Sequence, residues 1–146
     1  MRYFLPDLNV WLALSIRGHV HHQPAADWLN SVKGSAILSF TRPTQSGLLR
    51  LLTTEQVISA YQAKISSNDQ AWRIVQDWLD LDYVEMAVEA HGIDGLFKQF
   101  GSHAKPSPKL WMDAYLAAFA VRGGHQLVTF DAGFSQLKGL QPVLLR

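Results

Sequence analysis

Residues 2–14 read Arg-Tyr-Phe-Leu-Pro-Asp-Leu-Asn-Val-Trp-Leu-Ala-Leu. The class of fold follows from the division of this segment into a strand and a helix. Residues 2–5 are predicted to form a short buried strand, which Pro6 ends. Asp7 is a favourable N-cap residue, and a helix is predicted through residues 8–14. The segment therefore predicts a strand that passes directly into a helix, with a carboxylate at the junction.

Strands and helices alternate along the rest of the chain. Further strands are predicted at 36–40, 83–86, 126–130 and 142–145, and helices at 24–32, 44–52, 69–80, 89–100 and 109–122. Thr53 and Gln56 have the spacing of a capping box for one more helix. Because such alternation favours a parallel sheet covered on both faces, we predict an α/β fold with a mostly parallel central sheet of four to five strands.

The composition narrows the class of protein. With 146 residues, 48% hydrophobic and 17% charged, the chain is expected to form one globular domain over residues 1–146. No apolar run is long enough to cross a bilayer and the first residues do not resemble a signal peptide, so we expect a cytoplasmic protein with no membrane partner. The chain has no cysteine, so any metal ion must be held by oxygen atoms or histidine.

Three aspartates stand at positions that suit catalysis. Asp7 and Asp131 each follow a predicted strand, and ligands of parallel sheets bind beyond the carboxyl ends of the strands. Asp113 lies on the apolar side of the helix at 109–122, where a carboxylate is costly unless it is paired, neutralised or bound to a metal. If the three converge, their oxygens suit Mg²⁺ or Mn²⁺, and metal-assisted hydrolysis of phosphodiesters is the expected chemistry.

Each aspartate also has a purely structural interpretation. An N-cap role alone would explain Asp7, and a turn role alone would explain Asp131. Lys109 precedes Asp113 by four residues and is a possible ion-pair partner on the same helix. The three positions together favour a functional site more than any one of them does.

Two further features have open interpretations. No acidic residue occurs between Asp94 and Asp113, and this stretch is either a phosphate-binding surface or a solvated loop with the basic residues Lys98, His103, Lys105 and Lys109. The spacing of Trp11, Trp28, Trp72 and Trp78 predicts core or dimer packing. Trp111 is likewise expected in the core rather than as a platform for nucleic-acid bases.

Four segments occur in the order found in the PIN-domain family, and the chain resembles in particular its VapC toxin subgroup. They are Asp-Leu-Asn at 7–9, Thr-Gln-Ser-Gly-Leu-Leu-Arg-Leu-Leu-Thr at 44–53, Asp-Ala-Tyr-Leu-Ala-Ala at 113–118 and Thr-Phe-Asp-Ala-Gly-Phe at 129–134. The resemblance covers nearly the whole chain. It implies a PIN-like three-layer α/β/α fold and a magnesium-dependent endoribonuclease, the toxin of a type II toxin–antitoxin module. It also implies an RNA substrate, a VapB-like antitoxin and a homodimer, with apolar positions on the helices at 44–63 as dimer contacts.

The same resemblance assigns roles to particular residues. It places Asp7, Asp113 and Asp131 on the catalytic, metal-binding acids of the family. Asn9 falls on a supporting polar position, where it would bond a ligand. These assignments agree with the site that the strand ends predict.

Gln45 departs from the pattern of many PIN domains, which have a glutamate at this position. An amide can support a metal site through its carbonyl oxygen but adds no charge, so one or two metal ions remain possible. An ordinary buried amide is an equally open interpretation. Arg42, three residues earlier, is a candidate for binding a substrate phosphate.

Two other functions remain open. A degenerate PIN domain would bind RNA or a protein partner without cutting, and the missing charge at Gln45 supports this possibility. A small-molecule phosphatase would use an aspartate nucleophile after the first strand, but this chemistry usually needs a second acid two residues later, where this chain has Asn9.

Overall fold

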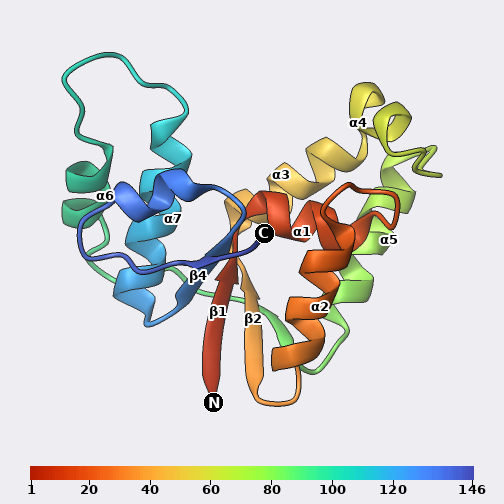
Figure 1. Cartoon of the computed structure of the whole chain (residues 1–146), viewed down its shortest axis with the longest axis horizontal. Coiled ribbons are helices and arrows are strands. Elements are labelled where there is room, and N and C mark those ends of the chain that lie inside the picture. The colour runs from red at the N-terminus through yellow and green to blue at the C-terminus, as the bar shows by residue number, and fades with distance from the viewer.

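The computed structural model describes residues 1–146 and has a five-stranded sheet. The sheet lies between two groups of helices (Figure 1). The strands are β1 (Arg2–Pro6), β2 (Ala36–Phe40), β3 (Val84–Met86), β4 (Gln126–Thr129) and β5 (Val143–Leu144). Their order is β3-β2-β1-β4-β5, and every neighbouring pair is parallel. The prediction of a mostly parallel sheet in a three-layer α/β/α fold is therefore confirmed.

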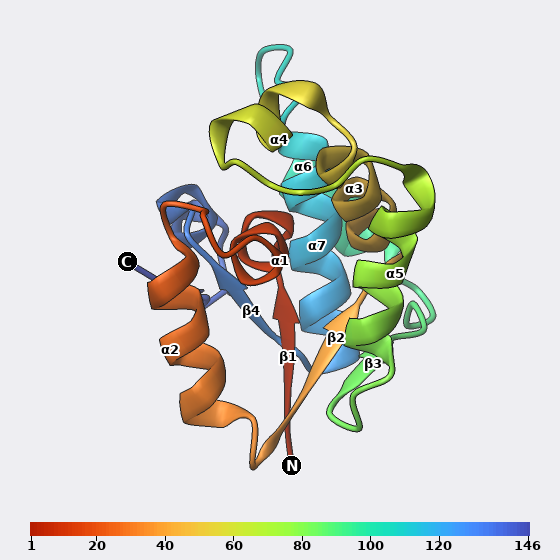
Figure 2. The same ribbon diagram turned by 90° about the vertical axis from the view of Figure 1, so that its right-hand side faces the viewer.

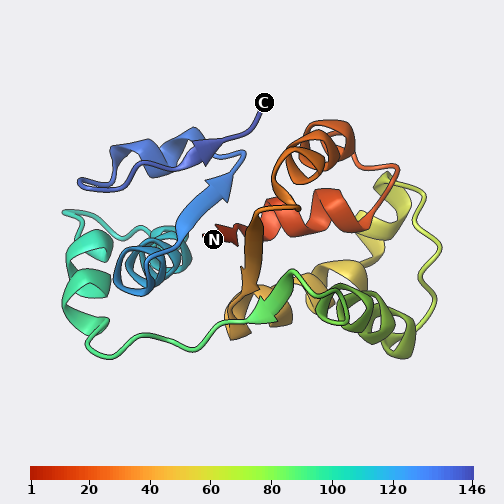
Figure 3. The ribbon, with the colours of Figure 1, turned by 90° about the horizontal axis from the view of Figure 1, so that it is seen from below.

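Helices cover both faces of the sheet. They are α1 (Leu8–Ser15), α2 (His22–Val32), α3 (Arg42–Leu52), α4 (Glu55–Ala60), α5 (Asn68–Leu79), α6 (Asp94–Gly101), α7 (Leu110–Gly123) and the 3₁₀-helix η1 (Ala132–Gln136). Seen from below, α6 and α7 lie on one side of the sheet and α1, α2, α3 and α5 on the other (Figure 3). Figure 2 shows the second group over its face of the sheet. No helix is both long enough and apolar enough to span a bilayer.

The second half of the central strand β1, residues 4–6, is buried on both faces, which explains why it is apolar. Phe4 is 1% exposed and meets Trp28 of α2 edge to face, with ring centroids 5.4 Å apart. Leu5 is fully buried in a second core cluster, which includes residues of α6 and α7. Successive side chains of a strand point to opposite faces, so β1 contributes to both halves of the core.

Small side chains let α7 lie close to the sheet. This helix has four completely buried alanines, Ala114, Ala117, Ala118 and Ala120. Gly124 ends the helix with φ of +72°, a left-handed conformation in which glycine carries no steric penalty. Because α7 packs tightly and ends sharply, β4 begins two residues later in register with β1.

The beginning of α3 is two residues earlier than predicted. Thr41 caps the helix: its Oγ1 accepts a hydrogen bond from the backbone N–H of Thr44 at 3.1 Å, and the Thr44 Oγ1 accepts one from the N–H of Thr41 at 2.9 Å. This capping box draws Arg42 into the first turn, directly after β2. The start of α3 is thereby fixed at the carboxyl end of the sheet.

The capping box predicted at Thr53 and Gln56 is wrong. The Thr53 hydroxyl instead donates to the carbonyl oxygens of Leu49 and Arg50, so this side chain ends α3. Helix α4 begins without a side-chain cap. Helix α6 also begins later than predicted, at Asp94 rather than at residue 89.

Two tryptophans lie at the surface: Trp111, which was expected in the core, and Trp72, which was expected in core or dimer packing. Trp72 on α5 is 53% exposed and Trp111 on α7 is 54% exposed, whereas Trp11 and Trp28 are buried. Helical spacing predicts which residues share a side, but not which side a neighbouring element covers. The first turn of α7, which carries Trp111, extends past the ends of the strands (Figure 1).

Candidate active site

Asp7 is held at the junction of β1 and α1 by hydrogen bonds to both carboxylate oxygens. Its backbone N–H donates to the carbonyl of Val128 in β4 at 2.8 Å. Its Oδ1 accepts from the backbone N–H of Leu8 at 2.7 Å, and its Oδ2 accepts from the hydroxyl of Thr129 at 2.8 Å. The side chain is only 7% exposed. Asp7 is therefore an N-cap, and it is also fixed to the neighbouring strand.

Thr129 links two of the three aspartates, and the sequence analysis missed its role. This fully buried residue ends β4, and its Oγ1 accepts from the backbone N–H of Asp131 at 3.0 Å while donating to Asp7. Pro6 pairs with Val128 in a parallel register, so the next residues, Asp7 and Thr129, are neighbours. That register becomes known only once the strand order is known.

Asp131 is exposed at the end of β4. Its Oδ1 accepts from the backbone N–H of Gly133 at 2.8 Å and caps the 3₁₀-helix, so the turn role suggested by the sequence is present. Asn9 lies on the other side of the same strand end, where its Oδ1 is 3.5 Å from the backbone nitrogen of Phe130. Both side chains thus lie at the carboxyl end of the sheet.

Asp113 is half-buried in the first turn of α7, and its pKa is raised to about 6. Burial contributes most to this shift, followed by the negative charges of Asp7 and Asp131. Lys109 is not among the groups that influence this pKa, so an ion pair with Lys109 does not explain the buried carboxylate. Three carboxylates from β1, α7 and β4 therefore lie within electrostatic reach of one another.

The pKa of Asp7 is raised as well. Burial is the largest cause, hydrogen bonds from Thr129 and Leu8 lower the value, and the charge of Asp131 raises it. Repulsion of this kind opposes the close approach of three carboxylates, and a bound divalent cation would offset it. No group of three or more histidine, aspartate or glutamate side chains is arranged closely enough to hold a metal ion. The donor chemistry fits Mg²⁺ or Mn²⁺, and binding would require the carboxylates to draw together.

Gln45 and Arg42 form a pair at the start of α3. Gln45 is 4% exposed, and its carbonyl oxygen accepts a hydrogen bond from the guanidinium of the exposed Arg42. The structure brings these two residues together, but the charge of Arg42 is not among those that shift the pKa of Asp7 or Asp113. The carbonyl oxygen of Gln45 is thus already engaged by a cation of the chain itself.

If Mg²⁺ binds at these carboxylates, the raised pKa of Asp113 predicts how its affinity depends on pH. As the pH falls through about 6, Asp113 takes up a proton that competes with the cation. The apparent Mg²⁺ affinity, measured as the rise in Tm on magnesium addition, should fall by roughly tenfold per pH unit below that value. The Asp113→Asn variant should bind Mg²⁺ weakly at every pH in this range, because it has lost this carboxylate. A constant affinity between about pH 5 and pH 7.5 would contradict the prediction.

Replacing Thr129 by valine should loosen Asp7 while preserving side-chain shape. The buried carboxylate would lose one of its two hydrogen-bond donors, so the free energy of unfolding should fall by roughly 1–3 kcal/mol in urea titrations. The pKa of Asp7 should rise further, because this hydrogen bond lowers it. Thr129→Ser keeps the hydroxyl and should retain most of the stability; equal stability of the valine variant and the parent would show that the bond contributes nothing.

The sequence matches a known protein family and is similar to two named ribonucleases. The family model described as PIN domain matches residues 4–140. Ribonuclease VapC41 of Mycobacterium tuberculosis is 43% identical over 142 residues, which are 97% of each chain. Ribonuclease VapC29 of the same organism is 34% identical over 143 residues, which are 97% of this chain and 95% of that protein.

Two solved structures have a similar fold. VapBC2 from Rickettsia felis, crystallised with a DNA fragment from its promoter, superposes with a TM-score of 0.70, 11% identity and 99% coverage of both chains. VapC20 of Mycobacterium tuberculosis, described as a toxin that cleaves the Sarcin-Ricin loop, has a TM-score of 0.68 at 15% identity, with 98% of this chain and 99% of that chain covered. At such identities the likeness concerns the fold alone.

Proposed function

Because this chain belongs to the PIN-domain family, among its VapC ribonucleases, we propose that it is a magnesium-dependent endoribonuclease built as one PIN domain over residues 1–146. It would act in the cytoplasm as the toxin of a type II toxin–antitoxin module. One observation carries the proposal: Asp7, Asp113 and Asp131 come from three separate elements and lie within electrostatic reach at the carboxyl end of the sheet.

Asp7, Asp113 and Asp131 would hold the magnesium ion, which supplies positive charge to stabilise the phosphate as a water molecule displaces the leaving oxygen. Within the chain, Thr129 and the backbone N–H of Leu8 orient Asp7. With a pKa of about 6, Asp113 is mostly ionised at neutral pH and can serve as a ligand.

Arg42 would bind a phosphate of the substrate beside this cluster. Its guanidinium has several donors, of which one is used on Gln45, and the side chain is otherwise open to solvent. Gln45 would then orient Arg42 instead of adding charge to a metal site. Asn9 would support the cluster at the end of β4.

The proposal is tested by RNA cleavage with purified protein that has been freed of any antitoxin. A panel of transfer RNA, messenger RNA and ribosomal RNA fragments is offered with Mg²⁺ or Mn²⁺, and in parallel with EDTA. A hairpin of the Sarcin-Ricin type belongs in the panel, because one structural neighbour cleaves it. Cleavage that requires the metal is the expected result.

A folded, antitoxin-free protein that cuts none of these RNAs under either metal would contradict the nuclease. Such a protein would match a degenerate PIN domain that binds without cutting. Gln45 adds no charge to the three acids of the cluster, and its carbonyl oxygen is already engaged by Arg42; this observation favours the second candidate. RNA affinity measured on the same protein would then decide whether RNA or a protein partner is bound.

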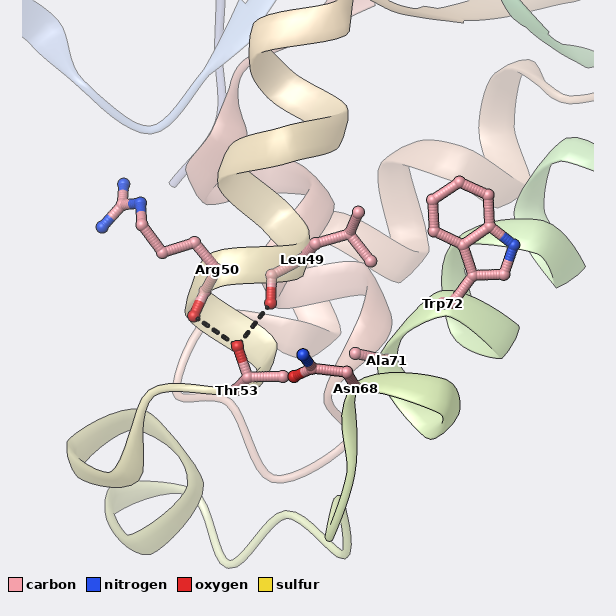
Figure 4. A pocket seen from close by; sticks show the side chains of 6 residues that line it. All are labelled: Leu49, Arg50, Thr53, Asn68, Ala71 and Trp72. Carbon is pink, nitrogen blue, oxygen red and sulfur yellow. Dashed lines mark hydrogen bonds between the residues drawn. The ribbon is translucent and has the colours of Figure 1, made fainter.

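A VapB-like antitoxin is the proposed protein partner, because one structural neighbour is a VapBC complex. We also propose a homodimer. Its contact surface would include the exposed side of α3 and α4 and the pocket between α3 and α5. That pocket has the side chains Leu49, Arg50, Thr53, Asn68, Ala71 and Trp72 along its walls (Figure 4).

Trp72 offers the clearest test of this dimer surface, since an indole that is 53% exposed is expected to be covered by a partner. Trp72→Glu should convert a dimer to a monomer in gel filtration with light scattering. Val88, which is 89% exposed in the segment after β3, provides the control Val88→Glu, which should leave the dimer intact. A parent protein that is monomeric at high concentration would rule out the dimer itself.

A further inference from the structure

A pocket of about 300 Å³ lies where α6 ends and α7 begins, and none of the assignments above uses it. Its walls are Gly101, residues 103–107 and Trp111. The loop that forms most of the wall rises beyond the carboxyl ends of the strands, on the same end of the molecule as the three aspartates (Figure 1). The pocket is therefore on the same end of the molecule as the candidate active site.

Trp111 forms an aromatic wall that is fixed on one side and open on the other. A Cβ atom at Gly101 would lie only 2.6 Å from Cζ3 of the indole, so the six-membered ring rests directly on the glycine. Phe97 of α6 meets the indole edge to face, with ring centroids 6.0 Å apart. With these contacts made, 54% of Trp111 remains exposed. A side chain so held presents an apolar surface without losing much conformational entropy on binding.

The rim of this pocket is basic. Lys105 is exposed in the pocket wall, and no acidic residue occurs between Asp94 and Asp113. Nδ1 of His103 lies 3.0 Å from the carbonyl oxygen and 3.1 Å from the backbone nitrogen of Lys105, and these contacts shape the loop. Nε2 of this exposed ring takes part in neither contact and is open to a ligand. The pocket thus combines one aromatic surface with donors and a cation that can meet a phosphate.

We propose that this pocket binds an unpaired base of the RNA substrate. The base stacks on Trp111, and Lys105 and His103 contact the adjoining phosphate. Aromatic surfaces beside cations are how proteins bind single-stranded nucleic acid. The inference rests on the proposed function, because it names how the same RNA is held.

The bound nucleotide is a neighbour of the bond that is cut, not the nucleotide at that bond. Trp111 and Asp113 are two residues apart in the first turn of α7, and each helical residue rotates by about 100°. Their side chains therefore leave the helix on nearly opposite sides. An RNA strand that reaches both must cross the beginning of α7, so the pocket would read a base that flanks the cleavage position.

The test separates binding from cutting. A short, fluorescently labelled single-stranded RNA is titrated with the Asp113→Asn protein, and Kd is measured by anisotropy. Adding Trp111→Ala should raise Kd by roughly 5- to 150-fold, the loss expected when one base-stacking aromatic is removed. Trp111→Phe retains a ring and should keep most of the affinity. Tyr3 is a similarly exposed aromatic residue near the amino end of β1, away from the carboxyl ends of the strands. Tyr3→Ala should therefore leave Kd unchanged.

Two further variants keep the test independent of folding defects at Trp111. Gly101→Ala should displace the indole without removing it and should weaken RNA binding as well. Lys105→Ala should reduce the slope of log Kd against log salt by about 0.7, the value for one phosphate contact on a single strand.

Equal RNA affinity of Trp111→Ala and the Asp113→Asn parent would overturn the pocket as an RNA subsite, and the exposed indole would then be a surface for a protein partner. That result would leave the nuclease untouched, because metal-dependent cutting is measured on the unmodified chain. Conversely, a chain that never cuts RNA but loses affinity with Trp111→Ala would refute the nuclease and retain the subsite.

Discussion

Asp113→Asn is expected to lower RNA cleavage by more than about 100-fold, since even residues that only support metal ligands contribute 10- to 100-fold. Asparagine keeps the size of the side chain but removes the charge that a divalent cation requires. Initial rates under saturating Mg²⁺ measure this effect. Asp77→Asn, an exposed aspartate on α5 outside the cluster, is the matched control and should retain full activity.

The same substitution should not destabilise the protein in the absence of metal. The pKa of Asp113 is raised in the folded state, so its ionised form opposes folding, and this cost appears as the pH rises from the unfolded value of 3.8 through about 6. Asparagine avoids the cost. At about pH 7.5 with EDTA, the variant should therefore be at least as stable as the parent in urea. The advantage should vanish near pH 4, where both side chains are neutral.

A combined loss of activity and stability at neutral pH would contradict this account of Asp113. It would mean that the carboxylate has a stabilising partner, as an ion pair with Lys109 would provide. Unchanged cleavage in the folded variant would instead remove Asp113 from the proposed active site. The two measurements on one variant thus distinguish a functional carboxylate from a structural one.

Trp11→Ala is expected to cause the largest loss of stability, roughly 3–5 kcal/mol in the free energy of unfolding. Trp11 is completely buried in α1 and stacks on Phe40 of β2, with ring centroids 3.8 Å apart and planes 10° from parallel. It also meets Trp78 of α5 edge to face at 5.5 Å. One side chain thereby joins α1, β2 and α5, and its removal would leave a cavity between all three.

Trp11→Phe is the matched variant for this prediction. The indole nitrogen of Trp11 has no hydrogen-bond partner, so phenylalanine loses part of the packing but no polar contact. It should cost less than half as much as alanine in urea or thermal unfolding. A similar cost for both variants would show that the shape of the indole, rather than the volume it fills, is decisive. Asp7 is the N-cap of helix α1, so a strongly destabilised variant should also lose cleavage.

Local patterns were sufficient to predict the fold. Apolar runs of strand length and helical spacing repeat along the chain, and a Gly-Gly pair ends the longest helix. These signals depend on residues within a few positions of one another, and alternation of strands and helices then favours a parallel sheet. Strand boundaries agree with prediction within a residue or two, whereas α3 and α6 begin elsewhere because their starting turns depend on Thr41 and on the segment after β3.

The arrangement of the strands was not predictable in the same way. No local pattern in β1 or β4 indicates that the two strands are neighbours, because their residues are separated by more than a hundred positions in the chain. The role of Thr129 depends on that pairing, because its hydroxyl meets Asp7 only when the two strand ends lie side by side. The exposure of Trp72 and Trp111 likewise depends on which elements lie beside α5 and α7.

The amino-acid sequence was enough to predict an α/β sheet and to place two aspartates after strands and a third on an apolar helix side. Caps, turns and hydrophobic periodicity act over a few residues, so they can be read directly from the chain. Only the tertiary structure decided that the three charges influence one another, that Gln45 meets Arg42, and that Trp111 borders an open pocket. Burial and electrostatic coupling arise between segments that are distant in the chain, and they exist only once folding has brought those segments together.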